Sequence, residues 1–271
     1  MRKMYEEFFE MKHTPFVNAI PVEALYLSEK HKEILGRLGY VAQGNRFAVV
    51  TAGVGVGKST LIRKFAQTLN PERFTVLYLS DSQLTPRWFY KGLLDQLGIE
   101  AKFYRGDAKR QLQKHLRLIR EVHHRNVLVV VDEAHLLDRE TFEEVRFVLN
   151  TEMDSSNPMA LVLVGQNELW DKLRMQLYAA IKGRIDIKCE LPGMDRAELD
   201  AYVRTHLSYA GGKYEIFTDA ALNELHRYSA GAARAVNKAA THCLMYAAQR
   251  AKKLIDDTMV KTVIDAELPY K

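Results

Sequence analysis

The chain has 271 residues, a formal net charge of +5, 47% hydrophobic residues and 2 cysteines. This length suits one large domain or two small ones, and Cys189 and Cys243 are too few for a disulfide framework. No apolar run reaches the roughly 18 residues that a membrane helix needs, and the N-terminus lacks a signal-peptide pattern. We therefore expect a cytoplasmic protein with no membrane partner. Its positive charge permits a polyanionic partner without requiring one.

The first segment, residues 1–45, is expected to pack on the core that follows. A helix is predicted to begin after Ser28, a candidate N-cap, and to end at Gly44. Apolar residues between these two positions recur at helical spacing, so one face of this helix should be buried.

A glycine-rich loop comes next, between an apolar run at 47–51 and an amphipathic stretch at 61–65. A strand, such a loop and a helix form a phosphate-binding site, because backbone N–H groups turn inward around the phosphates at the positive helix end. Lys58 is expected to reach the β- and γ-phosphates and Ser59 to hold Mg²⁺. Ala52 stands where the pattern has glycine, which makes the loop a variant. The predicted nucleotide-binding residues are Gly53, Val54, Gly55, Val56, Gly57, Lys58, Ser59 and Thr60.

Further β-rich runs and helical patterns alternate along residues 46–192. The runs include nearly continuous apolar stretches, as expected for parallel strands buried on both faces. Helical segments separate them, for example at 110–122 and 139–149. This alternation predicts an α/β fold with a parallel sheet. The expected strands after the first lie at 75–79, 127–131, 160–164 and 185–189.

The remaining residues, 193–271, carry helical patterns and no further strand signal. Asp195 and Glu198 have the spacing of a capping box, and Thr218 is a candidate cap for a second helix. Two more helices are expected near 232–250 and 257–267. The sequence thus predicts a C-terminal all-helical module.

Polar residues end two of the predicted strands. Asp132 and Glu133 follow the run 127–131, and the first carboxylate would orient Mg²⁺ while the second polarises the attacking water. The next strand ends before Gln166, the preferred candidate for sensing the γ-phosphate, with Asn167 as the alternative. His135 lies nearby, but no spacing of His with Cys suggests a metal site, and we expect an ordinary polar or core histidine.

Together these motifs resemble the AAA+ ATPases, in the group that contains ExeA-type ATPases and the transposition regulators TnsC, TniB, IstB and MuB. The segments at 4–9, 14–16 and 163–169 are similar to ExeA-type proteins, and the resemblance covers nearly the whole chain. It implies an AAA+ P-loop NTPase core followed by a helical lid. It also implies ATP and Mg²⁺ as cofactors, bound between core and lid and at a subunit interface.

The resemblance gives roles to two arginines. Arg184 is implied as an arginine finger acting on the neighbouring subunit, with Arg174 as the alternative. Arg234, in a Gly-x-x-Arg pattern, is implied to touch the γ-phosphate from the lid. The adenine pocket of the family is lined by N-terminal apolar residues, and the candidates Phe16, Tyr26 and Leu27 are not separated here from core residues.

The segment 80–120 interleaves basic and aromatic residues. In TnsC-like relatives this region faces the central pore and tracks a DNA backbone. Such contacts would be independent of base sequence and strongly salt-dependent. The aromatic residues could equally belong to the core and the basic ones to a solvated face. The candidate DNA-binding residues are Thr85, Arg87, Lys102, Arg105, Lys109 and Arg110.

These features predict an ATPase that assembles as a hexamer, a heptamer or a helical filament on double-stranded DNA. By resemblance, it would recruit or activate a transposase. One alternative is an ExeA-type secretion-assembly ATPase, for which a membrane helix and a periplasmic part would follow the lid, where this sequence ends. Another is an adaptor that binds ATP without hydrolysis, which would need a defective carboxylate in place of Glu133.

Overall fold

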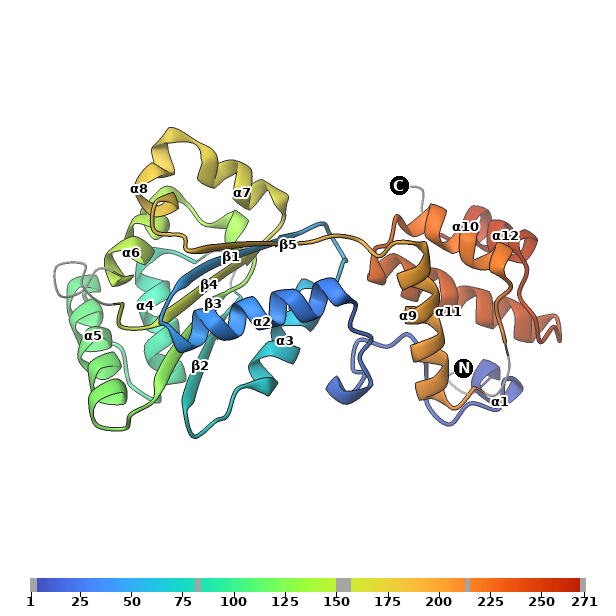
Figure 1. Cartoon of the computed structure of the whole chain (residues 1–271), viewed down its shortest axis with the longest axis horizontal. Helices are drawn as coiled ribbons and strands as arrows, with labels where there is room; N and C mark the ends of the chain where they lie inside the picture. Colours follow the sequence, from blue (N-terminus) through green and yellow to red (C-terminus); the bar gives the residue numbers. More distant parts are fainter. Residues whose placement is uncertain (1–3, 81–83, 150–156, 213–214, 269–271) are drawn as a thin grey trace. The chain divides into compact units, whose positions relative to one another are not determined.

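The structure is a computed structural model, and it describes residues 4–80, 84–149, 157–212 and 215–268. The chain divides into two compact units (Figure 1). The α/β unit comprises residues 30–52 and 58–191, and the helical unit comprises residues 1–29, 53–57 and 192–271. The N-terminal segment is therefore shared: its first 29 residues belong to the helical unit, and the helix that follows belongs to the α/β unit.

The α/β unit is built on a five-stranded sheet with the order β2-β3-β4-β1-β5. All neighbouring strands are parallel. The predicted α/β fold is therefore confirmed. Every residue of β1 and β4 is buried, which explains their unbroken apolar sequences. The strands are β1 (Phe47–Ala52), β2 (Phe74–Leu79), β3 (Asn126–Val131), β4 (Ala160–Gly165) and β5 (Ile187–Leu191).

Helices cover the sheet on both faces. One face carries the main apolar cluster, in which strand residues such as Val49 and Val129 pack against α4 to α8. Figure 1 draws α2 and α3 in front of the sheet, and α3 packs on β1. The helices are α2 (Glu29–Gln43), α3 (Lys58–Thr68), α4 (Pro86–Gln96), α5 (Arg105–Glu121), α6 (Arg139–Leu149), α7 (Asn167–Arg174) and α8 (Ala179–Lys182), with a 3₁₀ turn, η2, at Ala134–Leu136.

The edge strand β2 has its free backbone groups covered at one position by a side chain. Gln96 accepts a hydrogen bond from the backbone N–H of Tyr78 and donates one to its carbonyl, both at 2.8 Å. An unpaired strand edge is a template for unwanted pairing, and an amide that mimics a neighbouring strand satisfies it. The same contacts fix the backbone from which the Tyr78 side chain projects.

The helical unit has its own apolar core. Asp195 and Glu198 form a capping box at the start of α9, and the Thr218 hydroxyl caps α10, both at the predicted positions. Side chains from the N-terminal segment, including Tyr5 and Phe9, are part of this core. The helices are α1 (Met4–Phe8), α9 (Arg196–Ala210), α10 (Asp219–Ser229), α11 (Ala233–Gln249) and α12 (Asp257–Glu267). Among the described residues, none of the helices is both long and apolar enough to cross a bilayer.

Candidate functional site

The predicted site residues of the α/β unit gather at the carboxyl ends of its strands. Because all the strands are parallel, the loops after β1, β3 and β4 leave from the same edge of the sheet. In open parallel sheets this edge is where ligands bind. The three motifs found in the sequence follow these three strands.

Lys58 and Ser59 form the first turn of α3. Lys58 is only 8% exposed, and its Nζ donates a hydrogen bond to the carbonyl of Ala52 at 3.2 Å. The Lys58 ammonium group therefore lies over the start of the phosphate-binding loop. The Ser59 hydroxyl donates to Oδ2 of Asp132 at 3.2 Å. Ser59 and Asp132, which were both predicted to bind Mg²⁺, are thus 73 positions apart in the chain and in direct contact.

Asp132 is 3% exposed and accepts further hydrogen bonds. The Tyr78 hydroxyl donates to Oδ2 at 2.6 Å, and the backbone N–H of Glu133 donates to Oδ1 at 2.8 Å. Burial first, and then this hydrogen bond to Asp132, raise the pKa of Tyr78 above its ordinary value, so the phenol stays a donor. Sequence reasoning missed Tyr78. Only the adjacency of β2 and β3 brings it to the carboxylate.

A magnesium ion fits the donors present here. Mg²⁺ prefers oxygen ligands and is usually held by one or two protein groups, with water and phosphate oxygens completing the shell. The Ser59 hydroxyl and the Asp132 carboxylate supply such a pair. Within the described ranges no group of three or more His, Cys, Asp or Glu side chains could hold a metal, so an all-protein cage is not offered there.

Glu133 follows Asp132 in a left-handed conformation, with φ of 51° and ψ of 30°. This region is uncommon for residues other than glycine, and such strain is concentrated at functional sites. The conformation turns the chain into η2 directly after the strand. The Glu133 side chain is 41% exposed, with Oε2 3.5 Å from Nδ1 of His135.

Gln166 lies between β4 and α7, where its extended backbone precedes the first helical turn. Its side-chain Nε2 is 3.1 Å from Nε2 of His135. The structure thus brings Gln166 and Glu133 to opposite nitrogens of one imidazole. His135, which no sequence motif singles out, lies between them. The alternative candidate, Asn167, is already the first residue of α7.

Within the helical unit, Arg234 contacts the phosphate-binding loop. Its backbone N–H donates to the carbonyl of Gly55 at 2.9 Å. Gly55 has a φ of +72°, and a Cβ added there would lie 2.9 Å from Cβ of Arg234. Only glycine meets both demands. The contact places the start of α11 against the loop.

The other predicted residues lie elsewhere. Arg184 is half-buried in the connection between α8 and β5, and Arg174 is exposed at the end of α7. An arginine finger acts on a second copy of the chain, so neither position is expected to join the site of its own subunit.

Of the adenine-pocket candidates, Phe16 is part of the helical core. It stacks on His206 with ring centroids 5.3 Å apart, and its backbone N–H donates to His206 Nδ1 at 3.2 Å. Burial lowers the pKa of His206 to about 4, which keeps this nitrogen an acceptor. Tyr26 packs edge-on against Tyr202, and Leu27 is half-buried.

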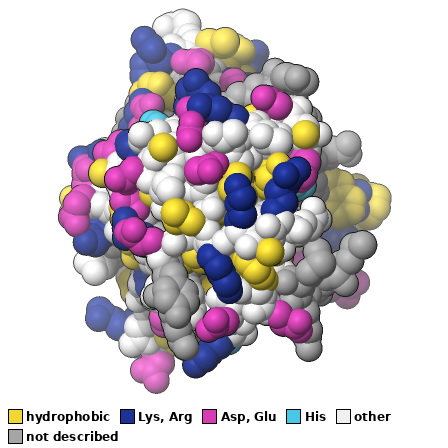
Figure 2. All heavy atoms as spheres, turned by 90° about the vertical axis from the view of Figure 1, so that its right-hand side faces the viewer, with side chains coloured by type: hydrophobic (Ala, Val, Ile, Leu, Met, Phe, Trp, Pro, Cys, Tyr) yellow, Lys and Arg dark blue, Asp and Glu magenta, His cyan; other side chains and the backbone are white. Residues whose placement is uncertain are grey.

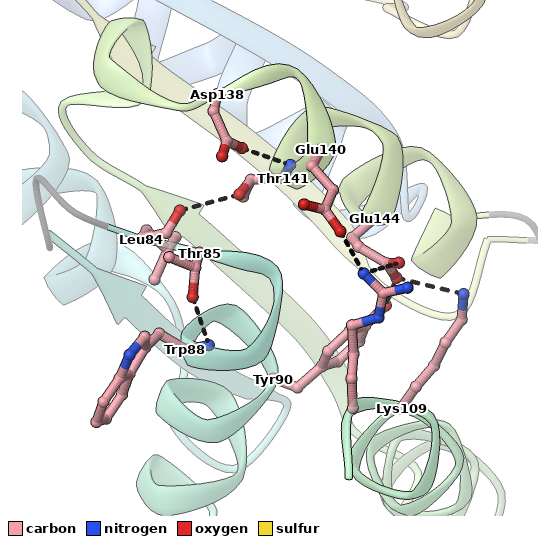
Figure 3. A network of polar contacts seen from close by, with 10 residues as sticks. Leu84, Thr85, Trp88, Tyr90, Lys109, Asp138, Glu140, Thr141 and Glu144 are labelled. Carbon is pink, nitrogen blue, oxygen red and sulfur yellow. Dashed lines mark hydrogen bonds and ion pairs between the residues drawn. The ribbon is translucent and has the colours of Figure 1, made fainter.

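The candidate DNA-binding residues lie on α4, on α5 and on the connection between them; residues 81–83 of the segment lie outside the described residues. Figure 3 shows that part of this set is engaged by carboxylates of α6. Arg105 lies 2.6 Å from Glu140 and 3.7 Å from Glu144, and Lys109 lies 3.4 Å from Glu144. The positive charge of these two residues is partly neutralised within the protein.

The remaining members of the set have weaker attachments. Arg110 pairs with Asp107 in the same helix at 2.7 Å, and Arg87 lies over the Phe103 ring at 4.5 Å. Lys102 is exposed, and the Thr85 hydroxyl caps α4. Elsewhere, basic and acidic side chains are interspersed on the face that Figure 2 shows. Of the six candidates, Arg87, Lys102 and Arg110 are thus exposed and not engaged by the carboxylates of α6.

The parallel sheet and the loops at the carboxyl ends of its strands together define a P-loop NTPase fold of the AAA+ type. Residues 41–173 match the family model described as AAA domain. The chain is also similar to General secretion pathway protein A of Aeromonas hydrophila, with 34% identity over 253 residues. This match covers 91% of the chain but 45% of that relative, so the chain spans less than half of its length.

Solved structures show the same fold. The Aeropyrum pernix ORC2 protein, in ADPNP–ADP complexes, matches with a TM-score of 0.65 and 16% identity, covering 98% of this chain and 72% of that one. Drosophila ORC bound to DNA matches with a TM-score of 0.70 and 18% identity, covering 99% and 66%. At these identities the likeness establishes the fold alone.

Proposed function

We propose that the chain is a Mg²⁺-dependent ATPase that works as a nucleotide-controlled switch. The observation that carries the proposal is the hydrogen bond between Ser59 and Asp132. A hydroxyl at the start of α3 and a carboxylate at the end of β3 form the pair that orients Mg²⁺ on the β- and γ-phosphates in P-loop NTPases. The AAA domain match over residues 41–173 supports the same activity.

The other site residues would divide the work around this ion. Lys58 would neutralise the β- and γ-phosphate oxygens, and the loop N–H groups of residues 53–59 would bind them. Glu133 would accept a hydrogen bond from the attacking water and orient it toward the phosphorus. Gln166 and Arg234 would contact the γ-phosphate, so that the site differs between ATP and ADP. Arg184 would complete the site of a neighbouring subunit.

Steady-state release of phosphate from ATP, titrated with Mg²⁺, tests this proposal. The wild-type chain should hydrolyse ATP only when Mg²⁺ is present, and Lys58→Ala should lose both nucleotide binding and turnover. Glu133→Gln should bind ATP normally and hydrolyse it about 100-fold or more slowly, because general-base contributions are of this size. A Glu133→Gln protein that turned over ATP like the wild type would remove the assigned role of this carboxylate.

We further propose that ATP binding assembles the chain on double-stranded DNA, where it recruits or activates a transposase. The exposed side chains of Arg87, Lys102 and Arg110 support this proposal, since each can neutralise a phosphate. The existence of a DNA-bound structure with the same fold is consistent with it. Contacts of this kind would position the protein on the duplex without reading its sequence.

A secretion-assembly ATPase is the second candidate function. The similarity to General secretion pathway protein A over 91% of this chain favours it. The two functions share the ATPase and differ in the partner. Fluorescence anisotropy of a labelled random-sequence duplex, at two salt concentrations and with ATP, ADP or no nucleotide, separates them. Salt-sensitive binding that requires ATP supports the DNA function, and no binding in any state at low salt supports the secretion function.

A further inference from the structure

The imidazole of His135 lies between the two side chains that would act on the γ-phosphate. Its Nε2 is 3.1 Å from Nε2 of Gln166, and its Nδ1 is 3.5 Å from Oε2 of Glu133. The histidine side chain is 12% exposed, whereas the Glu133 side chain is 41% exposed. The imidazole is therefore less exposed than the carboxylate that it faces.

The hydrogen-bonding capacity of the three groups fixes the direction of the chain. A carboxylate only accepts, so the nitrogen facing Glu133 must carry the proton. In the neutral ring Nε2 is then an acceptor, and the Gln166 amide nitrogen, which only donates, is the group placed against it. Nδ1 is buried and has no hydrogen-bond partner in the described part of the chain, and the Glu133 carboxylate, at 3.5 Å, is the acceptor that faces it. In this tautomer Gln166 donates to His135, and the Nδ1–H of His135 faces the Glu133 carboxylate at 3.5 Å.

The surrounding structure holds the ring in place. Lys172 donates through Nζ to the carbonyls of His135 and Leu137, at 2.7 and 2.9 Å, and so clamps η2. At the end of β4, a Cβ added to Gly165 would lie 3.2 Å from the backbone nitrogen of His135, so glycine permits this close approach. Second-layer contacts of this kind keep functional side chains within the narrow range that chemistry needs.

We propose that His135 is a positioning residue that connects the phosphate sensor Gln166 to the catalytic carboxylate Glu133. The Gln166 amide has two N–H groups, so one can remain on the imidazole while the other meets a γ-phosphate oxygen. The imidazole holds one oxygen of Glu133 and leaves the other for the attacking water. This inference rests on the proposed ATPase function and adds to it the residue that links sensing to hydrolysis.

Three substitutions of His135 test its two contacts separately, the arm from Nδ1 to Glu133 and the arm from Nε2 to Gln166. His135→Asn places an amide nitrogen near the position of Nδ1 and keeps the donor to Glu133. His135→Gln places its amide near Nε2 and keeps only the arm toward Gln166, and His135→Ala removes both. We expect kcat to fall about tenfold or more in the Ala and Gln variants, since misplacing a reacting group has effects of this size. His135→Asn should recover most of the loss.

The readouts distinguish positioning from a structural role. ATP affinity, followed with a fluorescent ATP analogue, and the melting temperature should stay close to wild type while kcat falls. His123→Asn, at an exposed position outside the network, is the matched control and should leave kcat unchanged. Gln166→Ala should also lower kcat, and the double variant with His135→Ala should be little slower than the slower single variant, because both changes break one chain.

The outcomes also separate this inference from the function on which it rests. A wild-type chain that hydrolyses no ATP with Mg²⁺ overturns the ATPase proposal and the connection with it. Wild-type turnover with an equally active His135→Ala variant overturns the connection alone. So does a His135→Asn variant as slow as His135→Ala, or a loss of kcat that follows a lowered melting temperature, because the histidine would then only support the fold.

Discussion

Two carboxylates of the α/β unit, Asp132 and Glu144, each accept a hydrogen bond from a tyrosine hydroxyl. Tyr78 donates to the first and Tyr90 to the second. Burial first, and then the hydrogen bond to the carboxylate, raise the pKa of both tyrosines, so both remain donors. Both carboxylates are themselves buried. By burial and tyrosine contact alone, the two positions would look equivalent.

Their other partners make them different. Asp132 also accepts from the Ser59 hydroxyl, an uncharged donor that orients the carboxylate without neutralising it. Glu144 lies beside two cations, with Arg105 at 3.7 Å and Lys109 at 3.4 Å. A buried charge compensated by the protein contributes to the fold, whereas one oriented by neutral donors can bind a cation from solution. Whether the groups around a buried carboxylate are neutral or charged therefore distinguishes a candidate cation-binding site from a structural cluster.

Replacing Asp132 by Asn should have the largest effect. The amide keeps an acceptor for the tyrosine and serine hydroxyls but loses the charge that holds Mg²⁺. We expect ATP turnover to fall about 100-fold or more, because metal-based charge stabilisation contributes several kcal/mol. Phosphate release across a Mg²⁺ titration measures the loss. Turnover close to wild type at low Mg²⁺ would show that the metal does not depend on Asp132.

Glu144→Gln is the matched substitution at the second carboxylate and should have the opposite profile. Lys109 would lose its charged partner and Arg105 the more distant of its two carboxylates, and the free energy of unfolding should fall by about 1–3 kcal/mol. Urea denaturation would measure this change, with the slope of the transition unchanged. ATP turnover at a temperature well below melting should stay within about twofold of wild type. A large loss of turnover would place Glu144 in the functional machinery and end the distinction.

Strands, helices and site residues that follow a recognisable sequence pattern can be predicted from the sequence alone. The strand cores were predicted because a strand buried on both faces is apolar throughout, as in β1 and β4. The helix predicted from Arg110 in fact begins at Arg105, where Tyr104 precedes it without a side-chain cap. A helix start with no capping residue leaves no signal in the sequence.

Within the candidate site, residues that lie outside any sequence motif likewise leave no signal from which to predict them. Ser59 and Asp132 are both predicted to bind Mg²⁺ because each belongs to a motif with its own strand and loop, and the structure brings the two side chains into contact. Tyr78 reaches the carboxylate only because β2 lies next to β3, and this order is a property of the sheet. His135 is predicted to be an ordinary polar or core histidine, because no spacing of His with Cys suggests a metal site. Its neighbours Glu133 and Gln166 follow different strands, so no single motif contains all three residues.

The two tyrosines offer a smaller, paired test. Tyr90 is fully buried, and Tyr90→Phe should lower the free energy of unfolding by about 1–2 kcal/mol, since a charged acceptor loses a donor. Tyr78 is 39% exposed, and Tyr78→Phe should cost less than Tyr90→Phe, about 0.5 kcal/mol, because Asp132 keeps its donors from the Ser59 hydroxyl and the Glu133 N–H. Only Tyr78→Phe should raise the Mg²⁺ concentration needed for half-maximal turnover, by a few-fold. Equal Mg²⁺ dependence in the two variants would remove the positioning role of Tyr78.

The smallest effects concern DNA, and they depend on which cations the protein already uses. Arg87 and Lys102 are exposed and face no carboxylate partner in the described contacts, so each is free to neutralise a phosphate. Each phosphate contact contributes about 0.9 to the slope of log affinity against log salt. If ATP-dependent binding is observed, replacing both residues by Ala should reduce that slope by about 2.

Lys109→Ala is the control for this measurement, because the Lys109 ammonium is already engaged by Glu144. Its salt slope should change by less than one unit, although the residue was an equal candidate by sequence. A larger change for Lys109 than for Arg87 and Lys102 would mean that DNA breaks the ion pair with Glu144 on binding. The cluster around Glu144 would then open in the complex, and its carboxylate would be a competitor of DNA instead of a fixed support of the fold.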